Sequence, residues 1–368
     1  MSECAKRRAI DATDQTIVMM DMSSLKPNDP RVSYKTANVN GKTYSYILGM
    51  PPQGQQPIDT VFLCHGFPDM AWGWRCQIPV LMSLGFRVIC PDMVGYAGSD
   101  APKELEAYSG KSVAADVKEL SAQIIGEGKQ IILGGHDWGG QVVYRVALFY
   151  PELVKAVFSV CTPYVPPNPK WISLEDIVRT HLPQFSYQLQ FAGPDVEKIV
   201  QGPEKIRQFL IAITGGKTQD GEYAIDVKSG GVDFKRLESM TKSPAMSDGD
   251  LDHYVSEYMK HEAPQLRGPL NWYRVRKINY DDEKKLLDER GPEASILNMP
   301  VLYIGATYDT ALPPIMSKGM DAVVAEGKLT RGEVKATHWA LWQAADDVNR
   351  IMGEWLGKVL ERQLKPSL

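Results

Sequence analysis

Residues 131–140 read Ile-Ile-Leu-Gly-Gly-His-Asp-Trp-Gly-Gly, and the rest of the chain is organised around this stretch. The apolar run 131–133 is typical of a buried parallel strand. Residues 141–150 then carry apolar side chains at helical spacing. Asp137 therefore stands at the corner where a strand becomes a helix. The glycines around it, Gly135, Gly139 and Gly140, allow the helix to approach the sheet closely.

A strand-to-helix corner of this kind is the nucleophile elbow of many hydrolases, here with an aspartate where a serine is more common. A second interpretation is that Asp137 only caps the helix, because Asp is a favoured N-cap residue. The elbow alone does not separate the two, so the remaining chemistry must be sought elsewhere in the chain.

The composition is that of an ordinary globular protein. The chain has 368 residues, 43% hydrophobic and 23% charged, enough for one large core and a second lobe. A net charge of −4 gives no reason to expect nucleic acid or an anionic membrane as a partner. Neither a signal peptide nor a transmembrane run is expected. The five cysteines include no CxxC pair, which indicates reducing conditions and a cytoplasmic protein. They are Cys4, Cys64, Cys76, Cys90 and Cys161.

The order of the predicted elements indicates an α/β fold. Residues 1–30 are polar and predict a surface extension, and a hairpin turning at Asn40-Gly41 follows. From 59 to 160, strands alternate with helices, among them 71–84 and 112–126, which favours a parallel sheet covered on both faces. After Thr162 several prolines lead into mostly helical sequence, with a Gly-rich stretch at 215–250 that predicts a long loop.

Strand and helix patterns return near Met299 and continue to a last helix over 343–360. The predicted core therefore comprises 31–162 and 295–368, and residues 163–294 form a mostly helical cap inserted into it.

Two further residues at predicted strand ends complete a candidate triad. Asp309 follows the strand at 299–305, and His338 follows a short strand near 333–335. Read in isolation, Asp309 is a turn residue and His338 a hydrogen-bonded loop histidine. The order nucleophile, acid, histidine is nevertheless the one that this type of elbow requires. Asp137 is thus the predicted nucleophile, His338 the general base, and Asp309 the residue that orients it.

An aspartate nucleophile suits attack on an sp³ carbon, which forms an alkyl ester. Water deprotonated by His338 would then attack the ester carbonyl and create an oxyanion. The backbone N–H groups of Phe67 and Trp138 are the expected oxyanion hole.

The sequence from about residue 30 to the end resembles the epoxide hydrolases of the α/β-hydrolase fold. The matching segments are the oxyanion-loop motif His65-Gly66-Phe67-Pro68, the elbow 135–140, the exit segments 162–164 and 168–169, and two tyrosine motifs at 185–189 and 267–274. The resemblance implies a mostly parallel eight-stranded sheet flanked by helices, with an inserted helical cap. It implies that Tyr187 and Tyr273 donate hydrogen bonds to the epoxide oxygen.

The implied reaction opens an epoxide with water to a vicinal diol, without a cofactor and without a metal. We expect the small apolar substrate to contact Trp138, Pro68 and Trp339. Aryl, terpene and fatty-acid epoxides, of xenobiotic or lipid origin, all remain open, as does the choice between monomer and homodimer.

Two other functions remain as alternatives. A haloalkane dehalogenase also uses an aspartate on sp³ carbon, and Trp138 would then bind halide, but a departing halide needs no proton from paired tyrosines. A non-catalytic ligand-binding domain of this fold is expected to lack a triad member. The sequence also departs from the family's usual pattern at Thr337, at Gln343-Ala344-Ala345 and at Tyr96-Ala97-Gly98.

Overall fold

The computed structural model describes residues 21–227 and 230–364, with the side chains of 362–364 left aside. The predicted surface extension 1–30 therefore lies mostly outside the described residues. Its described end packs on the core, because Leu25 is buried and its N–H donates to the carbonyl oxygen of Arg75 at 3.0 Å.

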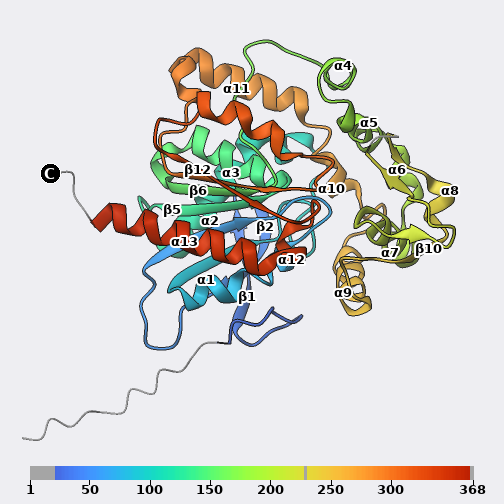
Figure 1. The fold of residues 1–368 in the computed structure, drawn as a ribbon, viewed down its shortest axis with the longest axis horizontal. Helices are drawn as coiled ribbons and strands as arrows, with labels where there is room; N and C mark the ends of the chain where they lie inside the picture. Colours follow the sequence, from blue (N-terminus) through green and yellow to red (C-terminus); the bar gives the residue numbers. More distant parts are fainter. Residues whose placement is uncertain (1–20, 228–229, 365–368) are drawn as a thin grey trace, which may run out of the picture.

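An eight-stranded sheet forms the centre of the molecule (Figure 1). β1 pairs antiparallel with β2, and β2 antiparallel with β4, while all the other pairs are parallel. The mostly parallel eight-stranded α/β prediction is confirmed. In spatial order the strands are β1 (Val32–Val39), β2 (Lys42–Gly49), β4 (Phe86–Pro91), β3 (Asp59–Cys64), β5 (Ile131–His136), β6 (Val154–Val160), β11 (Val301–Ala306) and β12 (Leu329–Val334).

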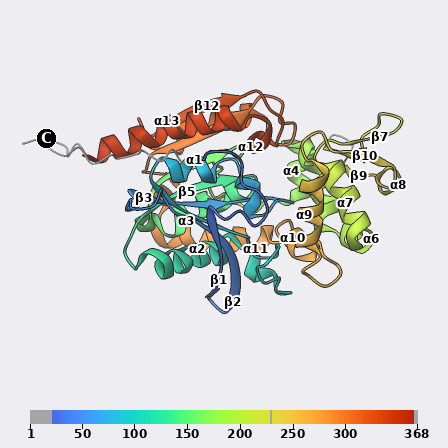
Figure 2. The ribbon, with the colours of Figure 1, turned by 90° about the horizontal axis from the view of Figure 1, so that it is seen from below.

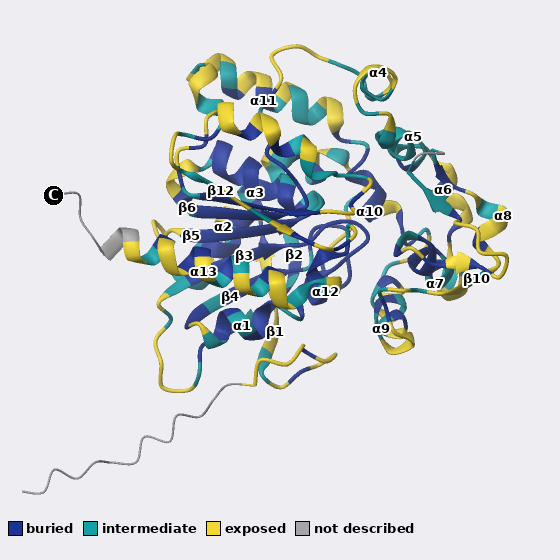
Figure 3. Cartoon of the chain, viewed as in Figure 1, coloured by how far each residue is buried: buried dark blue, intermediate teal, exposed yellow. Residues whose placement is uncertain are grey.

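Helices cover both faces of this sheet. In Figure 2, α13 and α1 lie on one side of the strands, and α2, α3 and α11 lie on the other. Each central strand is buried on both faces, as the dark blue strands of Figure 3 show. Along β3, Val61 and Leu63 join one apolar cluster while Phe62 and Cys64 join the other, because successive side chains of a strand point to opposite faces. The core helices are α1 (Ile78–Ser83), α2 (Gly110–Ile125), α3 (Trp138–Phe149), α12 (Ala340–Gln343) and α13 (Ala345–Leu364), with 3₁₀ helices η1 (Ala71–Trp74), η2 (Leu105–Tyr108), η3 (Pro151–Leu153) and η6 (Pro314–Ala322).

Local turn chemistry explains where the predicted elements hold and where they break. The hairpin is confirmed: Asn40 and Gly41 both take positive φ, 50° and 79°, as a tight two-residue turn requires. The single helix predicted over 71–84 is wrong, because it divides into η1 and α1. Pro79 lies in the first turn of α1, where its missing N–H costs nothing, whereas within a longer helix it would remove a hydrogen bond.

The insertion between β6 and β11 is mostly helical. In Figure 1, α4 to α9 lie beyond the end of the sheet, at the right, while α11 returns to lie on the core. A buried ion pair between Arg145 of α3 and Glu283 of α11, at 2.8 Å, fixes that return. The helices are α4 (Leu174–Thr180), α5 (Ser186–Ala192), α6 (Asp195–Ile199), α7 (Gly202–Ile213), α8 (Phe234–Leu237), α9 (Asp248–Tyr258), α10 (Arg267–Asn271) and α11 (Arg276–Arg290), with η4 (Pro183–Phe185) and η5 (Pro292–Ser295).

The long loop predicted at 215–250 is wrong for the described residues of that stretch. They form two short antiparallel pairs, β7 (Lys217–Thr218) with β10 (Met240–Lys242) and β8 (Ile225–Asp226) with β9 (Gly231–Val232), around the one-turn helix α8. The abundant glycines mark turns between these pairs rather than an open loop.

Candidate active site

Asp137 lies at the tight corner between β5 and α3. Its backbone takes φ 53°, which is uncommon for a residue other than glycine. The neighbouring glycines are needed for close contacts: a Cβ on Gly139 would stand 2.0 Å from the carbonyl oxygen of Cys64, and a Cβ on Gly135 would stand 2.3 Å from that of Gly139. The sequence expectation of a sharp elbow with small neighbours is confirmed.

The carboxylate of Asp137 points away from the helix that it precedes. It makes no side-chain capping bond to α3, so the interpretation of Asp137 as a helix cap is wrong. Its Oδ1 accepts a hydrogen bond of 2.8 Å from the backbone N–H of Phe67. Its Oδ2 lies 3.3 Å from Nε2 of His338. The two oxygens therefore have different partners.

Asp309 and His338 complete the constellation from the ends of β11 and β12. Nδ1 of His338 lies 2.7 Å from Oδ2 of Asp309. The other oxygen of Asp309 accepts the backbone N–H groups of Ala311 and Leu312, both at 2.9 Å. Asp309 is thus a turn residue and a partner of the histidine at once, and the structure brings all three predicted triad residues together.

The imidazole of His338 and the carboxyls of Asp137 and Asp309 shift one another's pKa toward the charged forms. Burial by itself lowers the pKa of His338, but the carboxylates of Asp309 and Asp137 outweigh burial and raise this pKa well above its usual value. Burial likewise opposes ionisation of Asp137 and of Asp309, and contact with His338 nevertheless lowers the pKa of each carboxyl. The two carboxylates therefore favour the charged form of the imidazole, and the imidazole favours the charged forms of the carboxylates.

The loop between β3 and η1 places Phe67 beside Asp137. His65 fixes this loop, because its Nδ1 lies 2.9 Å from the carbonyl oxygen of Gly66 and its Nε2 accepts the N–H of Met93 at 2.8 Å. Burial lowers the pKa of His65 to about 3. The ring is therefore neutral, and its two hydrogen bonds hold the loop in place. Trp138, the other expected oxyanion donor, begins α3, where N–H groups have no partner within the helix.

A cavity of about 580 Å³ opens beside Asp137. Asp137, Trp138, Tyr187 and Tyr273 all line it, so the cap tyrosines and the elbow share one space. Tyr187 comes from α5 and Tyr273 follows α10, and their ring centroids are 6.3 Å apart. Burial raises the pKa of both hydroxyls, which keeps them protonated and able to donate.

Comparison with known proteins identifies the family. Residues 59–198 match the family model described as alpha/beta hydrolase fold. An epoxide hydrolase of Neurospora crassa is 40% identical over 93% of this chain and its own full length. This chain belongs to the epoxide hydrolases. Bifunctional epoxide hydrolase 2 of Rattus norvegicus is 32% identical over 90% of this chain, which spans 56% of that longer protein.

Solved structures agree with this assignment. Epoxide hydrolase A of Mycobacterium thermoresistibile superposes with a TM-score of 0.71 at 27% identity, covering 88% of this epoxide hydrolase and 98% of that chain. An epoxide hydrolase of Vigna radiata, at 24% identity, shares the fold with a TM-score of 0.71 over 89% and 98% of the two chains.

Two residues expected to contact substrate lie outside the described walls of the cavity of this epoxide hydrolase. Pro68 faces the cap, where its carbonyl oxygen accepts the hydroxyl of Tyr258 at 2.7 Å. Trp339 stacks on Trp342 at 4.9 Å, and its indole N–H donates to the carbonyl oxygen of Ile213 at 3.3 Å. Both residues are thus occupied by core–cap packing, and Trp138 is the expected contact that lines the cavity.

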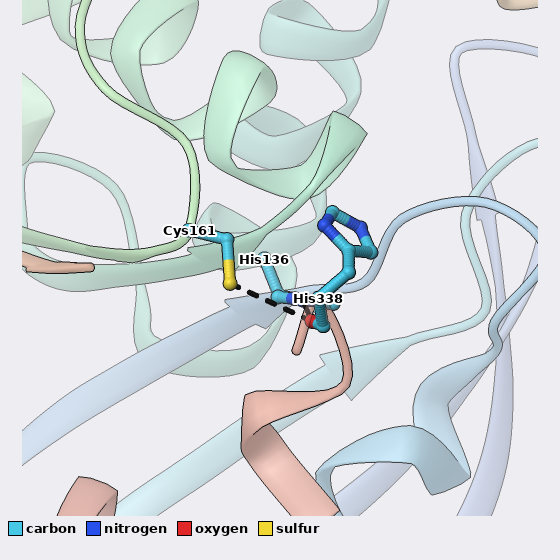
Figure 4. A group of neighbouring side chains, drawn as sticks. All are labelled: His136, Cys161 and His338. Carbon is cyan, nitrogen blue, oxygen red and sulfur yellow. Dashed lines mark hydrogen bonds between the residues drawn. The ribbon is translucent and has the colours of Figure 1, made fainter. Parts of the chain in front are cut away.

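Sequence reasoning missed two side chains that flank the histidine. Figure 4 shows His136, Cys161 and His338 close together, with side-chain ligand atoms within 4.8 Å of one another. Nε2 of His136 and the thiol of Cys161 both face the carbonyl oxygen of His338, at 2.8 and 3.5 Å. They hold the backbone of His338, whose own ring nitrogens already face carboxylates. Both residues stand at carboxyl ends of adjacent strands, β5 and β6, which is the signal that could have found them.

Two of the departures from the usual family pattern compensate each other. The N–H and hydroxyl of Thr337 both donate to Oε1 of Gln343, at 2.9 and 2.8 Å, which ties the loop before His338 to α12. At the third departure, Ala97 takes φ 47°, a conformation in which glycine would be less strained.

Proposed function

We propose that this chain opens an epoxide to a vicinal diol in two covalent steps. In the first step, an oxygen of Asp137 attacks an epoxide carbon and the ring C–O bond breaks, which leaves an alkyl ester on Asp137. Tyr187 and Tyr273 donate hydrogen bonds to the departing alkoxide oxygen and supply its proton.

The second step returns the enzyme to its starting form. His338 takes a proton from water, and the resulting hydroxide attacks the ester carbonyl while Asp309 stabilises the imidazolium. The oxyanion forms on the oxygen that faces Phe67 and Trp138, then collapses and expels the diol alkoxide. The two protons of the water, now on His338 and on the re-formed Asp137 carboxyl, pass to this alkoxide and to the tyrosinate left by the first step, which restores the enzyme. Water balances the whole reaction, so these steps require neither a cofactor nor a metal.

The observation that carries this proposal is the position of Asp137. Its carboxylate lies 2.8 Å from the backbone N–H of Phe67 and 3.3 Å from His338, and it lines the same cavity as the two cap tyrosines. A nucleophile, a base and proton donors therefore face one space, which is the minimum that two-step opening of an epoxide needs.

The triad residues come from the sheet-forming segments and the two tyrosines from the inserted helical segment. This supports the proposed domain boundaries, with a core of 31–162 and 295–368 and a cap of 163–294. Within the cavity, apolar residues such as Leu182, Phe185, Leu312 and Met316 favour a small apolar epoxide as the substrate.

Among the described helices, none is long and apolar enough to cross a bilayer. Buried thiols at Cys64, Cys90 and Cys161 are unpaired, which supports a reducing, cytoplasmic setting.

A single-turnover reaction with an aryl epoxide in ¹⁸O-labelled water tests the proposal. The covalent route predicts unlabelled diol in the first turnover and label entering Asp137, both measured by mass spectrometry. Labelled diol in that turnover would mean direct attack by water and would overturn the two-step mechanism. Absence of diol with a panel of epoxides, together with halide release from haloalkanes, would favour the dehalogenase alternative.

A further inference from the structure

Two tyrosines of cap helix α9 donate hydrogen bonds to the loop that carries the proposed oxyanion donor, the N–H of Phe67. We define the oxyanion loop as residues 65–69. The hydroxyl of Tyr258 donates to the carbonyl oxygen of Pro68 at 2.7 Å, and that of Tyr254 donates to Oδ1 of Asp69 at 2.5 Å. Both tyrosines are buried, 3% and 1% exposed. Consecutive residues of one short loop are thus held from the cap.

Helix α9 has contacts with both the cap and the core. Ser247 and Asp250 form a capping box at its start. Arg207 of α7 pairs with Asp248 and Asp252 of α9, at 2.7 and 2.6 Å. Around its buried face, Arg75 lies over the rings of Trp72 and Trp342, at 4.4 and 4.8 Å, and the ring of Tyr254 lies 5.9 Å from that of Trp72. The helix therefore contacts the rest of the cap on one side and the core on the other.

The held residues adjoin the donor directly. Phe67, whose N–H reaches Oδ1 of Asp137, lies between Gly66 and Pro68. A Cβ on Gly66 would stand 2.4 Å from the Cβ of Asp137, so the loop backbone already touches the nucleophile. A shift of the Pro68 carbonyl would therefore change the distance from the Phe67 N–H to Asp137.

The Tyr254 hydroxyl also has an energetic role in this loop. Asp69 is 2% exposed, and its Oδ2 has no hydrogen-bond partner among the described residues. Its Oδ1 is shared between Tyr254 and the N–H of Met70, at 2.8 Å. Removing the Tyr254 hydroxyl would leave a buried carboxyl with one donor, which favours movement of the loop toward other partners.

The two reaction steps use the Phe67 N–H in opposite ways. In the first step, negative charge leaves Asp137 as the ester forms, so a hydrogen bond to Oδ1 stabilises the starting state. In the second step, negative charge returns to that oxygen, and the same hydrogen bond stabilises the transition state. A loosened loop should therefore slow hydrolysis of the ester without slowing its formation.

We propose that Tyr254 and Tyr258 are positioning residues for the second step, through which helix α9 holds the Phe67 N–H against Asp137. This inference rests on the proposed two-step function. It gives the cap a part in both halves of the reaction: Tyr187 and Tyr273 act on ester formation, and α9 acts on ester hydrolysis.

The test compares Tyr254→Phe and Tyr258→Phe with wild type in single-turnover reactions with an aryl epoxide, followed by mass analysis of the Asp137 ester. Each variant is expected to hydrolyse the ester about 10-fold more slowly, with ester formation unchanged or faster, so that ester accumulates. The ratio of the two rate constants does not depend on the fraction of folded enzyme, and a loss of packing alone would leave this ratio unchanged.

Tyr164→Phe is the matched control, because the Tyr164 hydroxyl also donates from a buried ring to a backbone carbonyl, that of Ser295, at 2.5 Å, but away from the loop. The control should keep the wild-type ratio. If Tyr258→Phe and Tyr254→Phe keep it too, or slow ester formation instead, the inference is overturned while the two-step function stands. If neither wild type nor any of the variants forms an ester at Asp137 in a single turnover, the proposed two-step function itself fails.

Discussion

The core and the cap hold their reactive side chains in different ways. On the core, Asp309 accepts hydrogen bonds from two backbone N–H groups and faces His338, which in turn faces Asp137. In the cap, the hydroxyl of Tyr187 receives only a 3.3 Å hydrogen bond from the neighbouring Gln188 among the bonds described for it. The three triad side chains already contact one another, whereas no described hydrogen bond uses the Tyr187 hydroxyl as a donor.

This difference has a chemical reason. In the proposed mechanism, the second step needs a base whose orientation is fixed in advance, because a mobile imidazole would have to be ordered in the transition state. The first step needs donors for an oxygen that the substrate brings, so a hydroxyl already donating to the protein would be of less use. Predictions that separate the two regions therefore separate the two steps.

The largest effect is expected at the nucleophile. Replacing Asp137 with Ala should abolish turnover, a loss of at least about 10⁴-fold, because no ester can form. Asp137→Asn is the matched variant, since Asn tolerates the positive φ of this position better than Ala. Steady-state diol formation is the measurement. A variant that keeps the wild-type rate would remove Asp137 from the mechanism.

His338→Gln should separate the steps. Ester formation should continue while its hydrolysis slows by about 10³-fold or more, because water then lacks its base. Intact-protein mass spectrometry after mixing with epoxide should reveal an adduct of substrate mass on Asp137. Diol released at the wild-type rate, or a protein that never gains this mass, would contradict the role of His338 as the water-activating base.

The cap is expected to respond in the opposite step. Tyr187→Phe and Tyr273→Phe should each slow ester formation by about 10²-fold and leave hydrolysis of the ester nearly unchanged, because each loses a donor to the epoxide oxygen. Rapid-quench measurement of the ester gives both rates. If neither substitution changes ester formation, the assignment of the cap tyrosines fails and the dehalogenase alternative gains support.

The same contrast explains how much could be predicted from the sequence. Asp137 and Asp309 each follow a buried strand and His338 follows the edge strand β12. Parallel strands end at one edge of the sheet, so their meeting followed from the strand pattern. Tyr187 and Tyr273 lie on helices and turns that no such rule places, and only the resemblance to a family pointed to them. Their roles, like those of the triad, stay predictions until the variants are measured.

Other features depended on contacts that no local pattern contains. Tyr254 lies 185 positions after Asp69 in the sequence, and Tyr258 lies 190 positions after Pro68, yet each pair is joined by a hydrogen bond. Trp339 was expected to contact the substrate, yet it stacks on Trp342. Proximity in sequence to a catalytic residue says little about which way a large aromatic side chain will pack.

The smallest expected effect is a displacement of the pH profile. In the free enzyme, Asp309 and Asp137 both raise the pKa of His338 against the effect of burial. Once Asp137 is an ester its charge is gone, so the pKa of His338 should be lower in the intermediate than in the free enzyme.

Hydrolysis requires the neutral ring, and its rate should therefore rise with pH through the lower pKa and then reach a plateau. The pKa from single-turnover hydrolysis, compared with that from an NMR titration of His338 in the free enzyme, measures the difference. Asp137→Asn, which removes the charge without an ester, should bring the titration of the free enzyme down toward the kinetic value. An unchanged titration would show that Asp309 alone sets the protonation of the base, and the two carboxylates would then not act as one unit.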